Sequence, residues 1–397
     1  RQLTKMYEDE IKTRTPRTSF YNCLKNSAKQ FYMTNADGHY LFAGYPWFKV
    51  RARDEFIALP GCTLSNHHRP DFEAIMDTAK EAFTRWMETG EPDKHLQGID
   101  LPDVPLWAAW AIQRYSHDTD VPTARERYGE LVAQLIDFII DGKHPNLQVD
   151  DNGLVRTDGT RQPMSWMDSA RPDGTPLIPR TGYLVEFNAL WYNALMFLLQ
   201  MYADDKQMQS RVERWQKISD AYAESFAPTF LNDYGYLYDY VNGSYTDLSV
   251  RPNMVIAVGV DHTPLDRRQR KRILDFITRE LLTPKGLRTL SPNSYGYNPW
   301  YVGNPEQREK AYYSGSARPW LMGFYCHAYV KVFGIGGLSF VNRMMIGFED
   351  EMSQGAIGTL SELYDGNPPF IGRGAVSFAA NVGEILRVLR LLKNLDV

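Results

Sequence analysis

The sequence has few cysteines, and their arrangement suits neither a disulfide framework nor a zinc module. Cys23, Cys62 and Cys326 are the three cysteines of the 397-residue chain, and they lie far apart with no Cys-x-x-Cys pair. Disulfide scaffolds and structural zinc sites both need several thiols at short spacings. The cysteine content therefore favours a reducing compartment, and we expect the protein in the cytoplasm, without a bound metal.

Long apolar runs and an excess of one charge are also missing. The longest apolar stretch, around residues 190–199, contains Asn193 and is about half of the ~20 residues that a membrane helix needs. The first ten residues alternate in charge and lack the apolar core of a signal peptide. Lys and Arg total 44 against 48 Asp and Glu, a net charge of −4, which gives a polyanion no attraction. We expect neither a membrane nor a nucleic-acid partner.

The short motifs of several enzyme classes are absent as well. The patterns GxGxxG, GxxxxGK[ST], HExxH and GxSxG do not occur, which counts against nucleotide-binding proteins, zinc proteases and esterases. The adjacent pair His67-His68 has no carboxylate at the spacing of metal ligands, and we interpret it as a solvated turn. The sequence predicts no cofactor.

The spacing of apolar residues predicts helices along most of the chain. Apolar side chains recur every three or four positions over residues 128–139, 187–198 and 378–389, which is the period of one helix face. Strand-like segments are short and sparse, such as residues 236–241. We expect an all-α fold in one domain over residues 1–397, because no linker of different composition divides the chain. Further helices are predicted over residues 17–33, 54–66, 71–89, 104–118, 207–226, 266–281, 318–333 and 341–354.

The segments between the predicted helices are long. Residues 143–185, 231–250, 283–317 and 355–373 each exceed the ~12–15 residues beyond which a structureless loop usually has a functional reason. They are rich in Gly, Pro, Asn and Asp, and they contain many of the aromatic residues that form 13% of the sequence. Flat aromatic faces with polar edges suit ligand surfaces. The sequence thus predicts a site at one rim of a helical assembly.

Carboxylates beside aromatic residues are the candidate chemical groups of these loops. Asp168 follows Trp166 in the longest loop, and a neighbouring Trp raises the pKa of a carboxyl group by excluding water. Glu362 precedes the last predicted helix, and Arg53-Asp54 precedes an apolar helix start. Each group also has a structural interpretation, as a helix cap, a surface carboxylate or a local ion pair at an N-cap. The residues alone leave both interpretations open and favour a sugar-processing enzyme.

Read in order, short blocks of the sequence resemble the catalytic region of the glycogen-debranching amylo-α-1,6-glucosidase family. The blocks follow the family's order and span residues 44–366, nearly the whole chain. They are Gly44-Tyr45-Pro46-Trp47-Phe48, Arg53-Asp54 with Phe56-Ile57-Ala58-Leu59-Pro60-Gly61, Asp103 with Leu106-Trp107, Trp166-Met167-Asp168, Val185-Glu186 with residues 188–195, residues 235–239, Arg251-Pro252-Asn253, residues 281–284 with 286–290, Pro319-Trp320-Leu321 and Ser361-Glu362.

The resemblance implies an (α/α)₆ toroid, in which six inner and six outer helices surround a funnel and long loops form the rim of the active site. It also implies hydrolysis of the single α-1,6-linked glucose at a trimmed glycogen branch, with inversion at the anomeric carbon. Asp168 resembles the general acid of the family, and Glu362 resembles the general base. Glycogen or a branched α-glucan oligosaccharide is the partner that this implies.

The resemblance further implies a sugar pocket around the two carboxylates, in which polar residues hold hydroxyl groups and tryptophans form walls. For Arg251 and Arg288, the alternative to sugar binding is a structural role in which each holds a loop in place. The candidate residues are Trp47, Arg53, Asp54, Asp103, Trp166, Glu186, Trp191, Arg251, Arg288 and Trp320. Family members also carry a β-rich domain before the toroid. Because the chain begins with Arg1 rather than Met, we expect a fragment that lacks this domain.

The chain departs from the family pattern at the expected funnel. Arg51-Ala52-Arg53-Asp54-Glu55 stands where the family usually has Trp-Gly-Arg-Asp-Thr. Residues 312–315 read Tyr-Tyr-Ser-Gly in place of Tyr-His-Gln-Gly, and residues 317–320 read Ala-Arg-Pro-Trp in place of Val-Trp-Pro-Trp. Arg51 and Arg318 thus replace two tryptophans, which reduces stacking area and adds positive charge. Two alternatives follow: a glycosidase of the same fold for a charged oligosaccharide, or a glycan-binding relative without catalysis.

Overall fold

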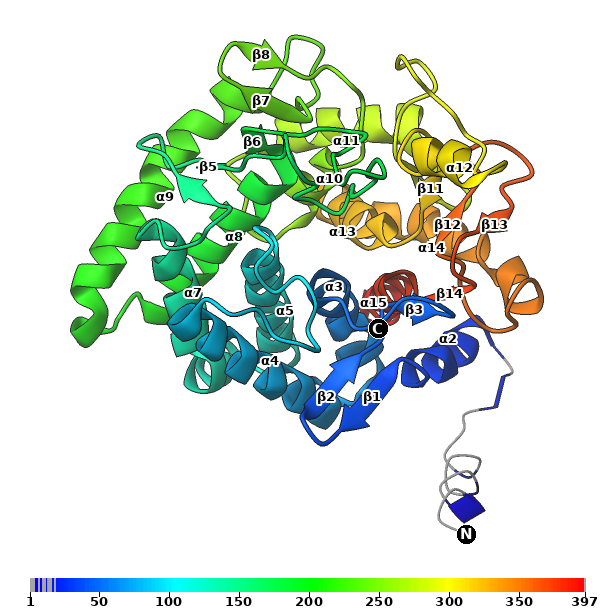
Figure 1. Ribbon diagram of the computed structural model, residues 1–397, viewed down its shortest axis with the longest axis horizontal. Helices are drawn as coiled ribbons and strands as arrows, with labels where there is room; N and C mark the ends of the chain where they lie inside the picture. Colours follow the sequence, from blue (N-terminus) through cyan, green and yellow to red (C-terminus); the bar gives the residue numbers. More distant parts are fainter. Residues whose placement is uncertain (1–3, 6–7, 9–11, 13–15, 18, 396–397) are drawn as a thin grey trace.

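The structure is a computed structural model that describes residues 4–5, 8, 12, 16–17 and 19–395, so the expectation for the first ten residues lies largely outside the described part. Helices make up most of that part (Figure 1), which confirms a mostly α-helical fold. In chain order the helices are α2 (Phe20–Lys29), α3 (Ala52–Cys62), α4 (Arg69–Thr89), α5 (Val104–Asp118), α6 (Val121–Ala124), α7 (Glu130–Ile140), α8 (Val185–Tyr202), α9 (Gln209–Phe230), α10 (Met254–Gly259), α11 (Arg267–Leu281), α12 (Pro305–Ala311), α13 (Leu321–Phe333), α14 (Leu338–Ile346) and α15 (Ala379–Leu395).

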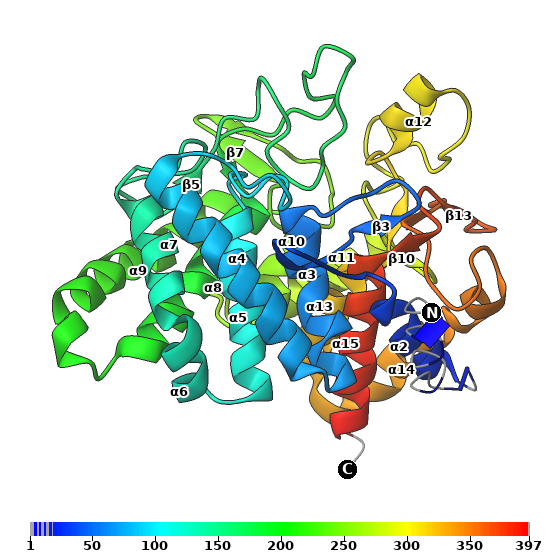
Figure 2. The same cartoon turned by 60° about the horizontal axis from the view of Figure 1, so that its bottom comes forward.

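Six of the described helices contact one another in a closed order. Helix α3 contacts α5, which contacts α8, and the contacts continue through α10 and α13 to α15, which packs against α3. Helices α4, α7, α9, α11 and α14 each lie in the chain between two consecutive members of this ring, and α2 precedes α3. In Figure 2 the loops and short strands gather toward the top, whereas α15 runs down to the C-terminus at the bottom.

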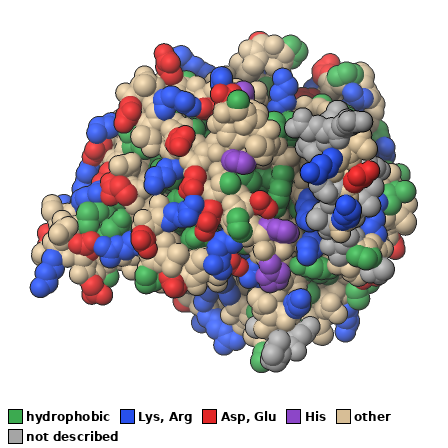
Figure 3. Space-filling model, turned by 90° about the horizontal axis from the view of Figure 1, so that it is seen from below, with side chains coloured by type: hydrophobic (Ala, Val, Ile, Leu, Met, Phe, Trp, Pro, Cys, Tyr) green, Lys and Arg blue, Asp and Glu red, His purple; other side chains and the backbone are tan. Residues whose placement is uncertain are grey.

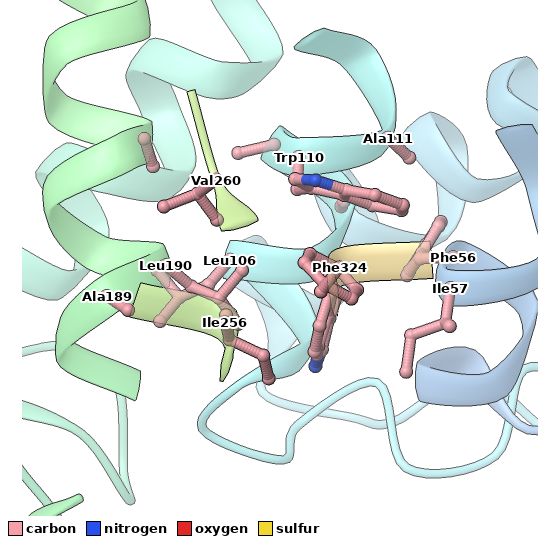
Figure 4. Packing of buried hydrophobic residues seen from close by; sticks show 14 of the residues in the cluster. Phe56, Ile57, Leu106, Trp110, Ala111, Ala189, Leu190, Ile256, Val260 and Phe324 are labelled. Carbon is pink, nitrogen blue, oxygen red and sulfur yellow. The ribbon is translucent and has the colours of Figure 1, made fainter. Parts of the chain in front are cut away.

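The ring helices are buried because their apolar residues face several neighbours at once. Every residue of α3 is buried, whereas the outer helix α4 buries one stripe that includes Phe72, Ile75 and Met76. Figure 4 shows Phe324 of α13 in the packed interior beside Trp110 of α5, with Phe56 of α3 on one side of it and Leu190 of α8 on the other. Charged residues within α3 therefore need partners inside the protein.

The strands are short and lie in the connections between helices. They are β1 (Tyr32–Asn35), β2 (Gly38–Leu41), β3 (Gly44–Tyr45), β4 (Gln148–Val149), β5 (Val155–Arg156), β6 (Tyr183–Leu184), β7 (Tyr240–Asn242), β8 (Tyr245–Thr246), β9 (Leu282–Thr283), β10 (Gly286–Arg288), β11 (Ala317–Arg318), β12 (Leu363–Tyr364), β13 (Gly372–Arg373) and β14 (Ser377–Phe378). The largest sheet is antiparallel, in the order β13-β12-β11-β10-β9. Ala317 pairs with Tyr364 in this sheet, which places Arg318 beside the segment that holds Glu362.

The structure differs from the predicted helices in several places. The helix expected over residues 17–33 ends at Lys29, because Tyr32–Asn35 pairs with Gly38–Leu41 as a hairpin. The helix expected over residues 341–354 begins earlier, as α14, and ends at Ile346. Helix α10 was not predicted: it is buried along its whole length, and an apolar run without polar positions has no period to detect.

One stretch of the described residues, Leu321–Ser353, is long and apolar enough by composition to cross a membrane. It consists of α13 and α14 with a 3₁₀ turn at Gly334–Gly337 between them, and α13 packs against α10 and α15. Core helices often pass such a test of composition, so the stretch is weak evidence for a membrane span. Figure 3 shows acidic and basic side chains interspersed over the face seen from below.

The contact between α3 and α15 predicts a large effect of one methyl group. A Cβ atom at Gly61 would lie 1.8 Å from the carbonyl oxygen of Gly383, so Gly61→Ala must push the two helices apart. We expect the free energy of unfolding to fall by about 1–3 kcal/mol or more, measured by urea denaturation. Gly336→Ala is the control, because its Cβ meets nothing within 4 Å. Equal midpoints for the two variants would contradict this account of the helix contact.

Candidate active site

A narrow pocket lies where α3, α13 and α15 begin. Its open volume is about 30 Å³, room for one or two water molecules, because long side chains fill most of the space. The lining comes from α3, the loop before β6, the segment after α12, and the starts of α13 and α15. The lining residues are Arg51, Arg53, Asp54, Ile57, Trp166, Tyr312, Tyr313, Arg318, Trp320, Glu362, Phe378 and Ala380.

Asp168 lies in the long loop between β5 and β6 and accepts two short hydrogen bonds. Arg51 Nη2 donates to Oδ2 at 2.6 Å, and the Tyr313 hydroxyl donates to Oδ1 at 2.6 Å. Burial raises the pKa of Asp168, but the positive charge of Arg51 and the hydrogen bond from Tyr313 outweigh it, so the pKa lies below its ordinary value. Asp168 is therefore ionised at neutral pH.

Glu362 lies just before β12 and is only 2% exposed. The backbone N–H of Ala375 donates to Oε2 at 2.9 Å, and Arg318 Nη1 is 3.6 Å from Oε1. Burial dominates over these contacts and raises the pKa of Glu362 to about 8, with a further contribution from the negative charge of Asp168. Glu362 is therefore protonated at neutral pH. The effect of Asp168 on this pKa also shows that the two carboxyl groups are electrostatically coupled.

Only a glycine at position 374 leaves room for the Glu362 carboxyl group. Gly374 has a φ of +69°, in the left-handed region, and a Cβ there would lie 2.3 Å from Oε2 of Glu362. A larger residue at 374 would thus strain the backbone and displace the carboxyl group. The turn before α15 in this way fixes one wall of the pocket.

Arg53 and Asp54 begin α3, and both are buried. Arg53 donates to both carboxylate oxygens of Asp103 at 2.7 and 2.9 Å, and Trp107 Nε1 donates to the same carboxylate at 3.1 Å. Asp103 thus orients Arg53 from behind the pocket. Asp54 lies 3.2 Å from Arg51, and within the described residues its Oδ2 atom accepts no hydrogen bond. This oxygen is the atom that faces Arg51 Nε in the ion pair, and because it accepts no hydrogen bond there, it can accept one from a hydroxyl group of a ligand.

Aromatic rings form the remaining walls. Trp166 meets Trp320 and Tyr313 edge to face, with ring centroids 5.1 and 5.3 Å apart. The indole N–H of Trp166 donates to Asn253 Oδ1 at 2.7 Å, which fixes the ring plane. Rings held in this way offer flat faces and edges to a sugar.

Glu186 and Trp191, which were expected at the sugar pocket, lie outside its lining. Arg180 forms an ion pair with Glu186 and another with Asp239, and all three side chains are buried. Trp191 is buried in α8 and donates its indole N–H to the carbonyl of Gly153 at 3.0 Å. Glu186, through Arg180, therefore supports the loop that carries Asp168, whereas Trp191 supports the turn between β4 and β5, and neither residue faces the pocket.

Arg251, Arg288 and Trp47 also lie outside the lining. Arg251 donates to the carbonyl of Tyr313 at 2.8 Å, and Arg288 donates to the carbonyl of Gly366 at 2.8 Å. These contacts match the loop-pinning alternative that the sequence left open. Trp47 follows β3 and is 58% exposed, so its ring is on the surface of the protein.

The lining residues that were not candidates include Arg51, Tyr313 and Arg318. Each of these three stands at a position where the chain departs from the family pattern. In the structure Arg51 and Tyr313 contact Asp168, and Arg318 lies near Glu362. The departures from the family pattern are therefore the signal in the sequence that could have found these residues, because each one adds a charge or a hydroxyl group beside Asp168 or Glu362.

Glu362 lines the pocket as a protonated carboxyl group, whereas the ionised Asp168 lies beside the pocket, hydrogen-bonded to the lining residues Arg51 and Tyr313. Such a pair supplies the base and the acid that cleavage of a glycosidic bond requires, and it is the kind of site that glycoside hydrolases use. The resemblance implies the acid role for Asp168 and the base role for Glu362, whereas the charges in this structure place the proton on Glu362. No group of three or more His, Cys, Asp or Glu side chains suited to a metal occurs in the described part of the chain.

The chain belongs to the amylo-alpha-1,6-glucosidase family, whose model matches residues 26–387. A curated relative, the glycogen debranching enzyme of Saccharomyces cerevisiae (strain ATCC 204508 / S288c), is 24% identical over 237 residues. This match covers 49% of the chain and 15% of the yeast enzyme. The chain thus corresponds to a small part of that relative.

Solved structures share the fold. A GH63 mannosylglycerate hydrolase from Thermus thermophilus, in complex with Tris and D-glycerate, has a TM-score of 0.61 at 12% identity and covers 93% of this chain and 99% of its own. The same hydrolase in complex with glucose has a TM-score of 0.60 at 13% identity, with coverage of 92% and 99%. At these identities the likeness concerns the fold alone.

The ion pair between Arg51 and Asp168 predicts that loss of the arginine changes the titration of the Asp168 carboxyl group. Arg51→Gln removes the positive charge and should raise the pKa of Asp168 by about 1 to 3. A carbon-13 NMR titration of the Asp168 carboxyl group measures the effect. Arg161→Gln, at an exposed position of the same loop, is the control and should leave the titration unchanged. An unaltered pKa in Arg51→Gln would show that Arg51 does not hold Asp168 ionised.

Proposed function

We propose that the protein is an inverting glycoside hydrolase of the debranching type, with Asp168 and Glu362 as its acid–base pair. The observation that carries the proposal is that Glu362 lines the pocket while Asp168, far away in the sequence, lies beside it and is hydrogen-bonded to the lining residues Arg51 and Tyr313. The closed order of helix contacts supports an (α/α)₆ toroid, with its funnel at the loop-rich end.

In hydrolysis of the glycosidic bond, the two carboxyl groups have different roles. One carboxyl group protonates the glycosidic oxygen as the bond from the anomeric carbon to that oxygen breaks. The other takes a proton from the water whose oxygen bonds to the anomeric carbon on the opposite face. Inverting enzymes separate the two groups by roughly 6.5–9.5 Å to admit this water. The pair begins and ends each cycle with one proton between its members.

Arg51 controls which member of the pair holds the proton. The acid role of Asp168 requires the proton to move there from Glu362, and the Arg51 guanidinium opposes this by stabilising the ionised form of Asp168. Arg51 lines the pocket and its side chain is 29% exposed, so an entering sugar ring can displace it. Once Arg51 moves away from Asp168, that carboxyl group can accept the proton.

The proposed reaction is the release of glucose from α-1,6 branch points of a glycogen limit dextrin. The family and the yeast relative support this substrate. Asp54 supplies an oxygen that is ion-paired with Arg51 but accepts no hydrogen bond, and Trp166 and Trp320 supply walls for a single ring. A pocket this narrow suits the removal of one terminal sugar. The three cysteines are free and buried, which supports action in a reducing compartment such as the cytoplasm.

Neutral replacements of the pair test the proposal directly. Asp168→Asn and Glu362→Gln keep the shape of each side chain but remove its ability to exchange a proton, and each should lower turnover about 10²- to 10⁴-fold. Release of glucose from a limit dextrin measures the effect. Asp158→Asn, on the same loop as Asp168 but exposed, should keep full activity. Normal glucose release by either pair variant would remove the assignment.

The raised pKa of Glu362 predicts the pH dependence of kcat/KM, which reports the ionisation of the free enzyme. Below the lowered pKa of Asp168 the pair holds two protons, and above the pKa of Glu362 it holds none. The reactive form has one proton, so kcat/KM should stay level through neutral pH and fall as the pH rises through about 8. An alkaline limb near pH 5 would mean that Glu362 titrates like an ordinary surface carboxyl group.

A further inference from the structure

Arg318 is a buried cation in the pocket with few partners. Its side chain is 4% exposed and contacts the adjacent rings of Tyr312 and Tyr313, with its Cζ atom 4.3 and 4.8 Å from their centroids. Nη2 donates to the carbonyl of Tyr312 at 2.7 Å, whereas Nε has no hydrogen-bond partner within the described residues. The guanidinium therefore keeps unused donors inside the pocket.

The carboxyl group next to Arg318 does not neutralise it. Glu362 is 3.6 Å away, beyond hydrogen-bonding distance, and it is protonated at neutral pH. An arginine keeps its charge in proteins. A buried charge without an ionised hydrogen-bonded partner is costly, and an anionic group of a ligand in this pocket would offset that cost.

Arg51 supplies a second cation at the same pocket. Its side chain is 29% exposed and reaches both Asp54, at 3.2 Å, and Asp168, at 2.6 Å. It is therefore the more solvent-exposed of the two arginines. Because it is shared between two carboxylates, it can turn toward an incoming anion while Asp54 stays in place at the start of α3.

We infer that the pocket takes a glycoside whose leaving part carries a carboxylate or phosphate group, and that Arg51 and Arg318 are the residues that select it. This inference rests on the proposed hydrolase function and narrows its substrate. Asp54 and Trp166 suit the hydroxyl groups and ring face of a neutral terminal sugar, and Asp54 would repel an anion on that sugar. The anionic group therefore belongs to the leaving part.

An anionic leaving part also fits the proton movement that hydrolysis requires. When the anion binds Arg51, the positive charge of Arg51 is neutralised by the anion and no longer stabilises the ionised form of Asp168. Asp168 then accepts the proton of the pair and delivers it to the glycosidic oxygen. A neutral leaving part gives Arg51 no new partner, so Arg51 stays with Asp168. A bound anion therefore increases both the affinity and the fraction of the enzyme in which Asp168 holds the proton.

The test compares substrates that differ only in the leaving part: isomaltose, its aldonate isomaltonate, and isomaltose 1-phosphate. Turnover of each is measured on the full chain. Calorimetry on the sulfur-linked analogues, which resist cleavage, measures binding without turnover. We expect one of the two acids to exceed the neutral disaccharide by about tenfold or more in both kcat/KM and affinity. The better acid identifies carboxylate or phosphate as the preferred group.

Variants of the two arginines assign the preference to them. Arg318→Gln and Arg51→Gln should each reduce the ratio of acid to neutral affinity by about tenfold, whereas Arg51→Lys keeps the charge and should retain most of it. Arg161→Gln, an exposed arginine on the Asp168 loop, should leave the ratio unchanged. If Arg318→Gln does not fold, Arg51→Gln and Arg51→Lys still give the answer.

The outcomes separate this inference from the proposed function. Equal affinity for the acid and neutral sulfur-linked analogues overturns the inference, even if isomaltose is hydrolysed. Selective binding of an acid without hydrolysis of any substrate overturns the hydrolase proposal and identifies an anionic-glycan binding protein. An acid preference that survives both Arg51→Gln and Arg318→Gln overturns the assignment to these arginines.

Discussion

The close packing of α3 against α15 is the constraint on which the site depends. At Gly61 and Gly383 the two helices approach so closely that neither position has room for a side chain. This contact joins the beginning of the ring to its end. It brings the start of α3, with Arg53 and Asp54, next to the start of α15 and the strand segment that holds Glu362. The pocket therefore exists only in the closed ring.

The electrostatics of the pocket follow from burial in a ring of apolar helices. Removal from water raises the pKa of Glu362, while a neighbouring guanidinium lowers that of Asp168. Two carboxyl groups that are alike in water thus become different in the protein. In the proposed mechanism this difference supplies an acid and a base, and Arg51 determines which of the two groups holds the proton.

Much of the fold could be predicted from the sequence, because outer helices such as α4 and α9 have one apolar face and therefore a helical period. Helix α10 escaped prediction, since it is buried on all sides and its six residues show no alternation. The five-stranded sheet escaped it too, because strands of two or three residues carry no pattern of their own. Their pairing depends on the ring that brings them together.

Part of the site could also be predicted, because blocks of the sequence resemble the family. The family blocks pointed to Asp168, Glu362 and Arg53-Asp54, all of which lie in or beside one pocket. Glu186 and Trp191 stand in similar blocks but support loops from behind. A block of sequence shows that residues matter together without showing which side chain faces the ligand.

The stereochemistry of the product tests the central claim most directly. Proton NMR of the first sugar released from the best α-linked substrate distinguishes the two anomers before they interconvert. If Asp168 and Glu362 act as acid and base with a water between them, the first product is the β-anomer. An initial α-anomer would mean that the configuration is retained, and it would contradict the account of how this pair works.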